Sequence, residues 1–145
     1  MTVIQLPETG YVPTEEDRAS LDAWFAEYDA RSARRDVERM ADMAVFPLNL
    51  VSDDPAGNGH AAQWDRERFV AVMTQVMGDG GGEGITFAST RTPVFLSSAM
   101  AVVFTDSAMT TGGGTQQLRY ADILVRRHGI WAFQTMLQSG WGDNL

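Results

Sequence analysis

The stretch LRYADILVRRHGIW, residues 118–131, decides the fold, because it reads as a strand, a tight turn and the start of a second strand. Alternate residues of a strand share one face, so Tyr120, Asp122 and Leu124 should point the same way. His128-Gly129 fits the two-residue turn of a hairpin. The stretch therefore predicts an antiparallel sheet in which one strand carries a carboxylate among apolar neighbours.

The rest of the second half of the chain has the same period of two. We expect strands over residues 85–96, 99–110, 116–127 and 130–140, joined by short connections at 97–98, 112–114 and 128–129. Strands with such short connections form an antiparallel meander. The glycine-rich segment 78–84 lacks a lysine and leads into a strand, so we interpret it as a connection and not as a phosphate loop.

The first half of the chain has the period of helices instead. Residues 14–17 resemble a capping box, and the apolar residues that follow at helical spacing are Leu21, Trp24, Phe25 and Tyr28. Asp36 is placed to cap a second helix, which should end before Pro47 because the residue preceding a proline avoids the helical region. The apolar face of this second helix would contain Val37, Met40, Ala41 and Ala44.

A short strand, residues 48–52, should follow, and Asp65 is placed to cap a third helix. The apolar stripe of that helix would contain Phe69, Val72, Met73 and Val76, with Gly78 as its left-handed end. Helices first and a meander afterwards predict an α+β domain, with three N-terminal helices packed on a curved, mostly antiparallel sheet. We expect one domain over residues 14–145, preceded by an N-terminal extension, 1–13.

The composition excludes several classes of function. The chain of 145 residues has 11 basic and 19 acidic residues, a net charge of −8 and no cysteine. The negative charge disfavours nucleic acid and membrane surfaces as partners, and thiolate chemistry is excluded. The contexts of His60 and His128 do not suggest a metal site, and no apolar run is long enough to span a bilayer. We expect a cytoplasmic protein that uses no cofactor or metal.

The predicted hairpin also gives Asp122 a direction. A two-residue turn would place Leu124 opposite Phe133 and Asp122 opposite Thr135, on the face with most of the bulky side chains. Asp122 should therefore point toward the helices. The opposite face, with Arg119, Gln134 and Met136 among its residues, suits a partner-facing surface.

A buried acid at this place has two interpretations. It is either a structural group that is hydrogen-bonded to Thr135, to a tyrosine or to an arginine such as Arg91, or a chemical group whose pKa is raised by desolvation so that it can move a proton. The sequence leaves both open.

The order of elements, together with RRDVERMADMAVF (34–46) and GIWAFQTMLQSGW (129–141), resembles the nuclear-transport-factor-two-like superfamily. This superfamily includes ketosteroid isomerases, SnoaL-like polyketide cyclases, limonene epoxide hydrolases and scytalone dehydratases. The resemblance covers roughly residues 14–140 and implies a cystatin-like cone. It also implies a pocket for a hydrophobic small molecule between the sheet and the helices, and a homodimer formed through the outer face of the sheet.

Comparison with ketosteroid isomerases implies three catalytic residues. Tyr28 and Asp122 lie where those enzymes have the tyrosine and the protonated aspartate of the oxyanion hole, and Asp54, before Pro55, resembles their general base. Each also has a plainer interpretation: Tyr28 completes an apolar helix stripe, and Asp54 lies in a run of turn-forming residues. The segment between Asp36 and Asp54 is longer than in ketosteroid isomerases.

Two classes of function follow. The first is a cofactor-free isomerase, cyclase or dehydratase that acts by acid–base proton transfer on a hydrophobic carbonyl-type substrate. The second is a non-catalytic ligand-binding or dimerisation module, in which Asp122 is a core acid. In either case we expect the pocket to be lined by Trp24, Phe25, Met40, Met43, Phe46, Phe69, Met73, Tyr120, Trp131, Phe133 and Thr135.

Overall fold

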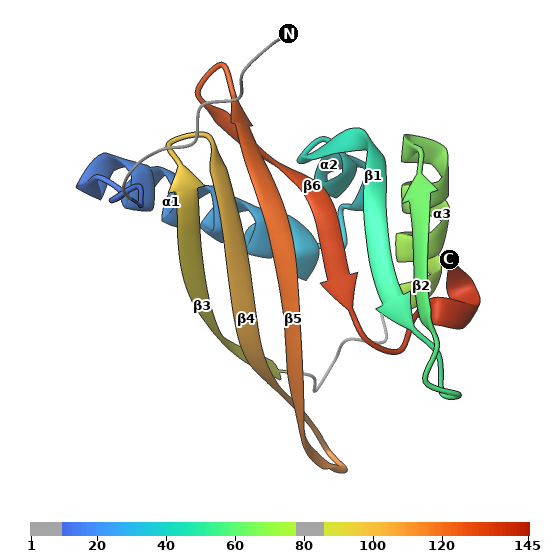
Figure 1. Ribbon diagram of the computed structural model, residues 1–145. Coiled ribbons are helices and arrows are strands. Elements are labelled where there is room, and N and C mark those ends of the chain that lie inside the picture. Colours follow the sequence, from blue (N-terminus) through green and yellow to red (C-terminus); the bar gives the residue numbers. More distant parts are fainter. Residues whose placement is uncertain (1–9, 78–85) are drawn as a thin grey trace, which may run out of the picture.

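The fold is described by a computed structural model that covers residues 10–77 and 86–145. One mixed sheet has the strand order β2-β1-β6-β5-β4-β3, and its helices lie on one face (Figure 1). The elements in chain order are α1 (Glu15–Ala33), α2 (Val37–Ala41), β1 (Ala44–Asp53), β2 (Gly59–Trp64), α3 (Arg66–Met77), β3 (Thr86–Ser97), β4 (Met100–Thr111), β5 (Gly114–Arg127), β6 (Ile130–Gln138) and the short 3-10 helix η1 (Gly142–Asn144). The predicted α+β class is confirmed.

The predicted helix starts are confirmed by their hydrogen bonds. The backbone N–H of Asp17 donates to the Thr14 hydroxyl at 3.0 Å, and the backbone N–H of Thr14 donates to the Asp17 carboxylate at 2.9 Å, which completes the capping box of α1. The Asp65 carboxylate accepts from the backbone N–H of Arg68 at 2.8 Å at the start of α3. Gly78 and the rest of segment 78–84 lie outside the described residues.

The predicted second helix is too long, because strand pairing takes over its last residues. α2 ends at Ala41, and β1 begins at Ala44, which pairs with Phe133 of β6 in a parallel arrangement. The backbone N–H of Phe133 donates to the Met43 carbonyl at 2.9 Å. Pro47 lies inside β1, at the point where the register with β6 is interrupted, so its missing N–H breaks no regular ladder.

β2 is an element that the sequence pattern did not predict. Residues 59–64 pair with β1 in an antiparallel hairpin, from Asp53 opposite Gly59 to Leu48 opposite Trp64. The polar residues around Asp54 form its turn, where Gly57 has a φ of 87°. Pairing with β1 outweighs the weak strand pattern of Gly59–Trp64, which contains two alanines and a glycine.

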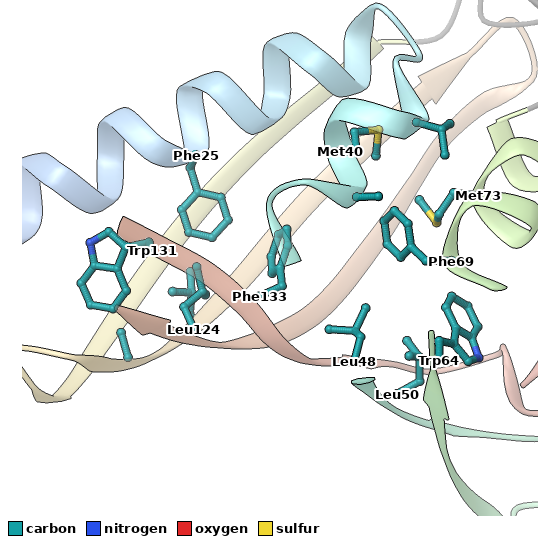
Figure 2. Packing of buried hydrophobic residues seen from close by; sticks show 14 of the residues in the cluster. Phe25, Met40, Leu48, Leu50, Trp64, Phe69, Met73, Leu124, Trp131 and Phe133 are labelled. Carbon is teal, nitrogen blue, oxygen red and sulfur yellow. The ribbon is translucent and has the colours of Figure 1, made fainter. Parts of the chain in front are cut away.

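The core joins the sheet to all three helices (Figure 2). At one end, Phe25 of α1 packs with Leu124, Trp131 and Phe133 of the sheet; at the other, Phe69 and Met73 of α3 and Met40 of α2 lie above β1. We call the sheet face that α1 covers the inner face. Within the described parts of the chain, no helix is both long and apolar enough to cross a membrane.

Candidate functional site

The inner face changes from apolar to polar along the strands. Paired residues place Phe95, Ala101, Leu124 and Phe133 in one row across β3 to β6. The next row is Pro93, Val103, Asp122 and Met136. The third row, which we call the inner polar row, is Arg91, Thr105, Tyr120 and Gln138. Asp122 therefore lies at the boundary between the buried apolar end of the face and its polar end.

The partner of Asp122 on β6 differs from the prediction. The two-residue turn at His128-Gly129 and the pairing of Leu124 with Phe133 are as expected. An extra residue in β6 then shifts the register, so Asp122 pairs with Met136 and Thr135 pairs with Ile123. A bulge of this kind reverses the faces of the residues beyond it. Met136 thus lies on the inner face with Asp122. Thr135 was predicted to lie on that face, and it lies on the outer face instead, where it pairs with Ile123.

Asp122 is a buried carboxyl group without a hydrogen-bonding partner. Its side chain is 6% exposed, and no other side chain or backbone group in the described residues hydrogen-bonds to it. Desolvation by burial raises its pKa to about 7, and this value already includes the opposing effect of the nearby Arg91 guanidinium. The group can thus change protonation state near neutral pH, as an acid–base catalyst must.

Arg91 does not neutralise Asp122, because it is engaged elsewhere. Its two terminal nitrogens donate to the Asp29 carboxylate of α1 at 2.6 and 2.7 Å, and its guanidinium lies 4.2 Å from the centre of the Phe25 ring. This bidentate pair fixes the arginine. The interpretation of Asp122 as one half of a salt bridge with Arg91 is therefore not what the structure shows.

Two tyrosines lie close to Asp122. Burial raises the pKa of Tyr28, and the carboxylate of Asp122 raises it further. Burial also raises the pKa of Tyr120, against the opposing effect of Arg91. The Tyr28 ring packs edge-on against Phe133, with 4.8 Å between the ring centres, and stacks on Trp24. Both hydroxyls keep their protons at neutral pH and are available as donors.

Asp54 lies in a different part of the molecule, in the turn of the β1–β2 hairpin (Figure 1). Its carboxylate is 2.7 Å from Nε2 of His60 and accepts from the backbone N–H of Asn58 at 3.0 Å. The bond with His60 is the main cause of its lowered pKa, followed by the bond with Asn58. The structure thus brings Tyr28 and Asp122 together, and it does not bring Asp54 to them.

Most of the residues predicted to line a pocket pack against one another instead. Those that are buried in the core cluster are Phe25, Met40, Phe69, Met73, Trp131 and Phe133, with Trp24 and Phe46 packed against it. Met43 and Thr135 are also buried, and Tyr120 is half-buried.

Two cavities lie away from Asp122. One, of about 190 Å³, lies between α3 and the C-terminal residues and is lined by Arg68, Val72, Gln75, Val76, Trp141 and Asn144. The other, of about 20 Å³, has room for about one water molecule. It touches Met136 and Gln138, the register partners of Asp122 and Tyr120. None of the predicted lining residues forms a wall of either cavity.

Sequence reasoning named Tyr120 and Arg91 but did not place them in one row with Thr105 and Gln138. Thr105 is fully buried, and its hydroxyl has no hydrogen-bonding partner within the part of the chain that the structure describes. The Nε atom of Arg91 is also buried and has no hydrogen-bonding partner among the described residues. The alternation of Ala101, Val103 and Thr105 indicated one strand face, but only the register places that face next to Tyr120. Among the described residues, no cluster of acidic and histidine side chains is arranged to hold a metal ion.

Comparison with known proteins supports the fold. No protein-family model matches the sequence, and no curated protein matches it either. Many solved structures resemble it, and for three of them we quote the share of this chain, and then of the other chain, that the match covers. An NTF2-like protein of unknown function from Pseudomonas putida KT2440 has a TM-score of 0.68, 12% identity and coverage of 87% and 87%. Another NTF2-like protein of unknown function, from Shewanella oneidensis MR-1, has a TM-score of 0.64, 14% identity and coverage of 84% and 98%. A ketosteroid isomerase-like protein from Erwinia carotovora atroseptica SCRI1043 has a TM-score of 0.57, 17% identity and coverage of 87% and 97%.

The chain therefore has the nuclear-transport-factor-two-like fold, as its sequence pattern predicted.

Proposed function

We propose that this protein binds a hydrophobic carbonyl compound at the inner face and moves a proton on it with Asp122, without a cofactor. The observation that carries the proposal is the position of Asp122 at the boundary between an apolar and a polar surface. Its carboxyl group is buried, has no hydrogen-bonding partner among the described residues, and has a pKa raised to about 7. An acid–base catalyst works best when its pKa is close to the working pH.

The chemistry assigns one role to each group. Ionised Asp122 takes a proton from the carbon next to the carbonyl, the electron pair of the broken C–H bond forms a C=C bond, and the carbonyl π pair moves onto the oxygen. Tyr28, which stays protonated, donates a hydrogen bond to that oxygen and stabilises the enolate. When a neighbouring C=C bond extends the enolate, protonated Asp122 gives the proton to the far carbon of that bond, the oxygen electron pair re-forms the carbonyl, and the shifted double bond makes the product an isomer. Asp54, paired with His60, has no part in this scheme.

Neither of the two cavities described above is lined by Asp122, so in this scheme a side chain beside it moves to admit the ligand. Met136 is the side chain suited to this: it is the register partner of Asp122, it lines the smaller cavity, and methionine is unbranched and adaptable. The polar end of the face is the side from which a ligand arrives, because Ser89 is exposed there and Tyr120 is half-buried. The apolar row beyond Asp122 then receives the hydrocarbon part.

Exchange of deuterium into a ketone tests the proposal. With butyrophenone in D₂O, the protein should accelerate replacement of the hydrogens next to the carbonyl, and Asp122→Asn should reduce this rate at least about 100-fold. The matched control is Asp106→Asn, which removes a carboxylate that is paired with Arg119 on the exposed surface of β4; this variant should keep the full rate. Equal rates for all three proteins would contradict a catalytic Asp122.

The other class of function, a non-catalytic binding protein, predicts a different result in the same experiment. Butyrophenone should then raise the melting temperature, because a ligand stabilises the state it binds, while the exchange rate stays at that of the buffer. The core interpretation of Asp122 would be favoured by this result.

We also propose a homodimer formed through the outer face of the sheet. Register pairs place Val94, Val102 and Ile123 in one row across β3 to β5, and Phe104, Ala121 and Leu137 in another across β4 to β6. This outer apolar patch includes exposed bulky side chains: Phe104 and Val94 are each 46% exposed. A contiguous apolar surface of this kind is typical of an interaction site.

Replacing Phe104 with aspartate tests the dimer, because a carboxylate at the centre of an apolar interface lacks a partner. Sedimentation velocity should show a dimer for the natural protein and a monomer for Phe104→Asp. Val76→Asp, at an exposed position on α3, is the control and should remain dimeric. A tight dimer has a Kd in the nanomolar range. If the natural protein sediments as a monomer at about 100 times such a concentration, the proposal is contradicted.

A further inference from the structure

The inner polar row contains two buried polar atoms that have no hydrogen-bonding partner among residues 10–77 and 86–145. They are the hydroxyl of Thr105, a residue with no exposed surface, and Nε of Arg91. Arg91 and Thr105 are direct register partners on neighbouring strands, and Tyr120 is the partner of Thr105 on the next strand. A buried hydroxyl without a hydrogen bond lowers stability, so a structural role does not explain it.

These atoms lie one row from Asp122 on the same face. Residues two apart along a strand are separated by roughly 7 Å, and Thr105 and Tyr120 follow the row of Val103 and Asp122 at that spacing. One small molecule that reaches Asp122 with a carbonyl group therefore extends to the polar row with its next few atoms.

The charge of the second group on the ligand also follows from the contacts. The guanidinium of Arg91 is already matched by the bidentate Asp29 carboxylate, and the chain as a whole has a net charge of −8. A further carboxylate would add a second negative charge beside Asp29, whose partner Arg91 is already matched. A neutral oxygen needs only the N–H and O–H groups that have no partner.

We propose that the ligand is a neutral compound with two oxygen-bearing groups, in which one carbonyl is held beside Asp122 and a second neutral oxygen accepts hydrogen bonds from Thr105 and Arg91. The proposal rests on the proposed function, because it places the first carbonyl at Asp122. It adds a class of ligand: keto esters and similar dicarbonyl compounds, in preference to simple ketones or keto acids.

Three matched compounds test this preference by quenching of tryptophan fluorescence, for which Trp24 lies next to Tyr28. Methyl benzoylpropionate has a ketone and a neutral ester, benzoylpropionic acid has a ketone and a carboxylate, and butyrophenone has the ketone alone. The natural protein should bind the ester about tenfold more tightly than butyrophenone, which is the gain of roughly one hydrogen bond. The acid should bind more weakly than the ester.

Thr105→Val replaces the hydroxyl with a methyl group of similar size, and Thr105→Ser keeps the hydroxyl. Thr105→Val should abolish the preference for the ester, leave the affinity for butyrophenone unchanged and raise the melting temperature by about 3 °C, because it removes an unpaired buried group. Thr105→Ser should keep the preference. A residue that only shapes the fold would change the affinity for both compounds alike.

The outcomes separate this proposal from the one on which it rests. If butyrophenone binds and the ester has no advantage, or if Thr105→Val weakens both compounds equally, the two-oxygen ligand is wrong and the role of Asp122 stands. If none of the three compounds binds to the natural protein, both proposals are wrong.

Discussion

Truncation of Phe133 to alanine is expected to lower the free energy of unfolding by about 3–5 kcal/mol. The ring is 2% exposed and lies at the centre of an aromatic cluster, with its centre 4.7 Å from that of Trp24, 4.8 Å from Tyr28 and 6.2 Å from Phe25. α1 and β6 meet at this ring, so the cavity left by alanine would lie where the helix joins the sheet. Denaturation by urea, followed by tryptophan fluorescence, measures the loss.

The matched control for this variant is Phe87→Ala, the same truncation at a phenylalanine that is 63% exposed on β3. It should cost less than about 1 kcal/mol, because little apolar surface leaves the interior. Similar losses for the two variants would mean that Phe133 is not the packing centre that the structure describes.

Replacement of Asp122 with asparagine is expected to change how stability depends on pH. A carboxyl group whose pKa is raised in the folded state keeps its proton there while the unfolded chain loses it, so stability falls as the pH rises between the two pKa values. The pKa of Asp122 is about 7 when folded and 3.8 ordinarily. The natural protein should therefore lose about 4 kcal/mol, relative to Asp122→Asn, between pH 4 and pH 8.

The difference between the two proteins isolates this one group. Asp17 and Asp53 have lowered pKa values, Asp17 chiefly because it accepts a hydrogen bond from Tyr11 and Asp53 chiefly because it accepts one from Ser139. Their contributions are present above their unfolded pKa and are lost as the pH falls, and they are common to both proteins. Urea denaturation at several pH values gives the comparison. A constant difference across this range would show that the Asp122 carboxyl titrates normally.

Local signals in the sequence were sufficient for most of the fold. The side chains of Thr14 and Asp65 cap helices within a few residues of themselves, and the His128-Gly129 turn fixes its hairpin by its own geometry, so each is readable without the rest of the chain. The end of α2 was not readable, because pairing of Ala44 with the distant β6 decides it. β2 was missed for the same reason: its partner, β1, stabilises a segment whose own pattern is weak.

The site was predictable to the extent that it depends on one element. Alternation along β5 and the short turn after it were enough to place Asp122 on the inner face, and helical spacing was enough to place Tyr28 on the apolar stripe of α1. The bulge that exchanges Thr135 for Met136 follows from how two strands fit together. The same holds for the row that joins Arg91, Thr105 and Tyr120, since residues on three strands meet there through registers that no local pattern specifies.

The proton on Asp122 is the feature on which the proposed chemistry depends, and NMR titration of its side-chain carboxyl carbon measures it directly. With the signal assigned by its absence from Asp122→Asn, the midpoint of the titration should lie close to 7. A midpoint near 4, the ordinary value for an aspartate, would mean that the carboxylate is ionised and well solvated at neutral pH, and would contradict the account.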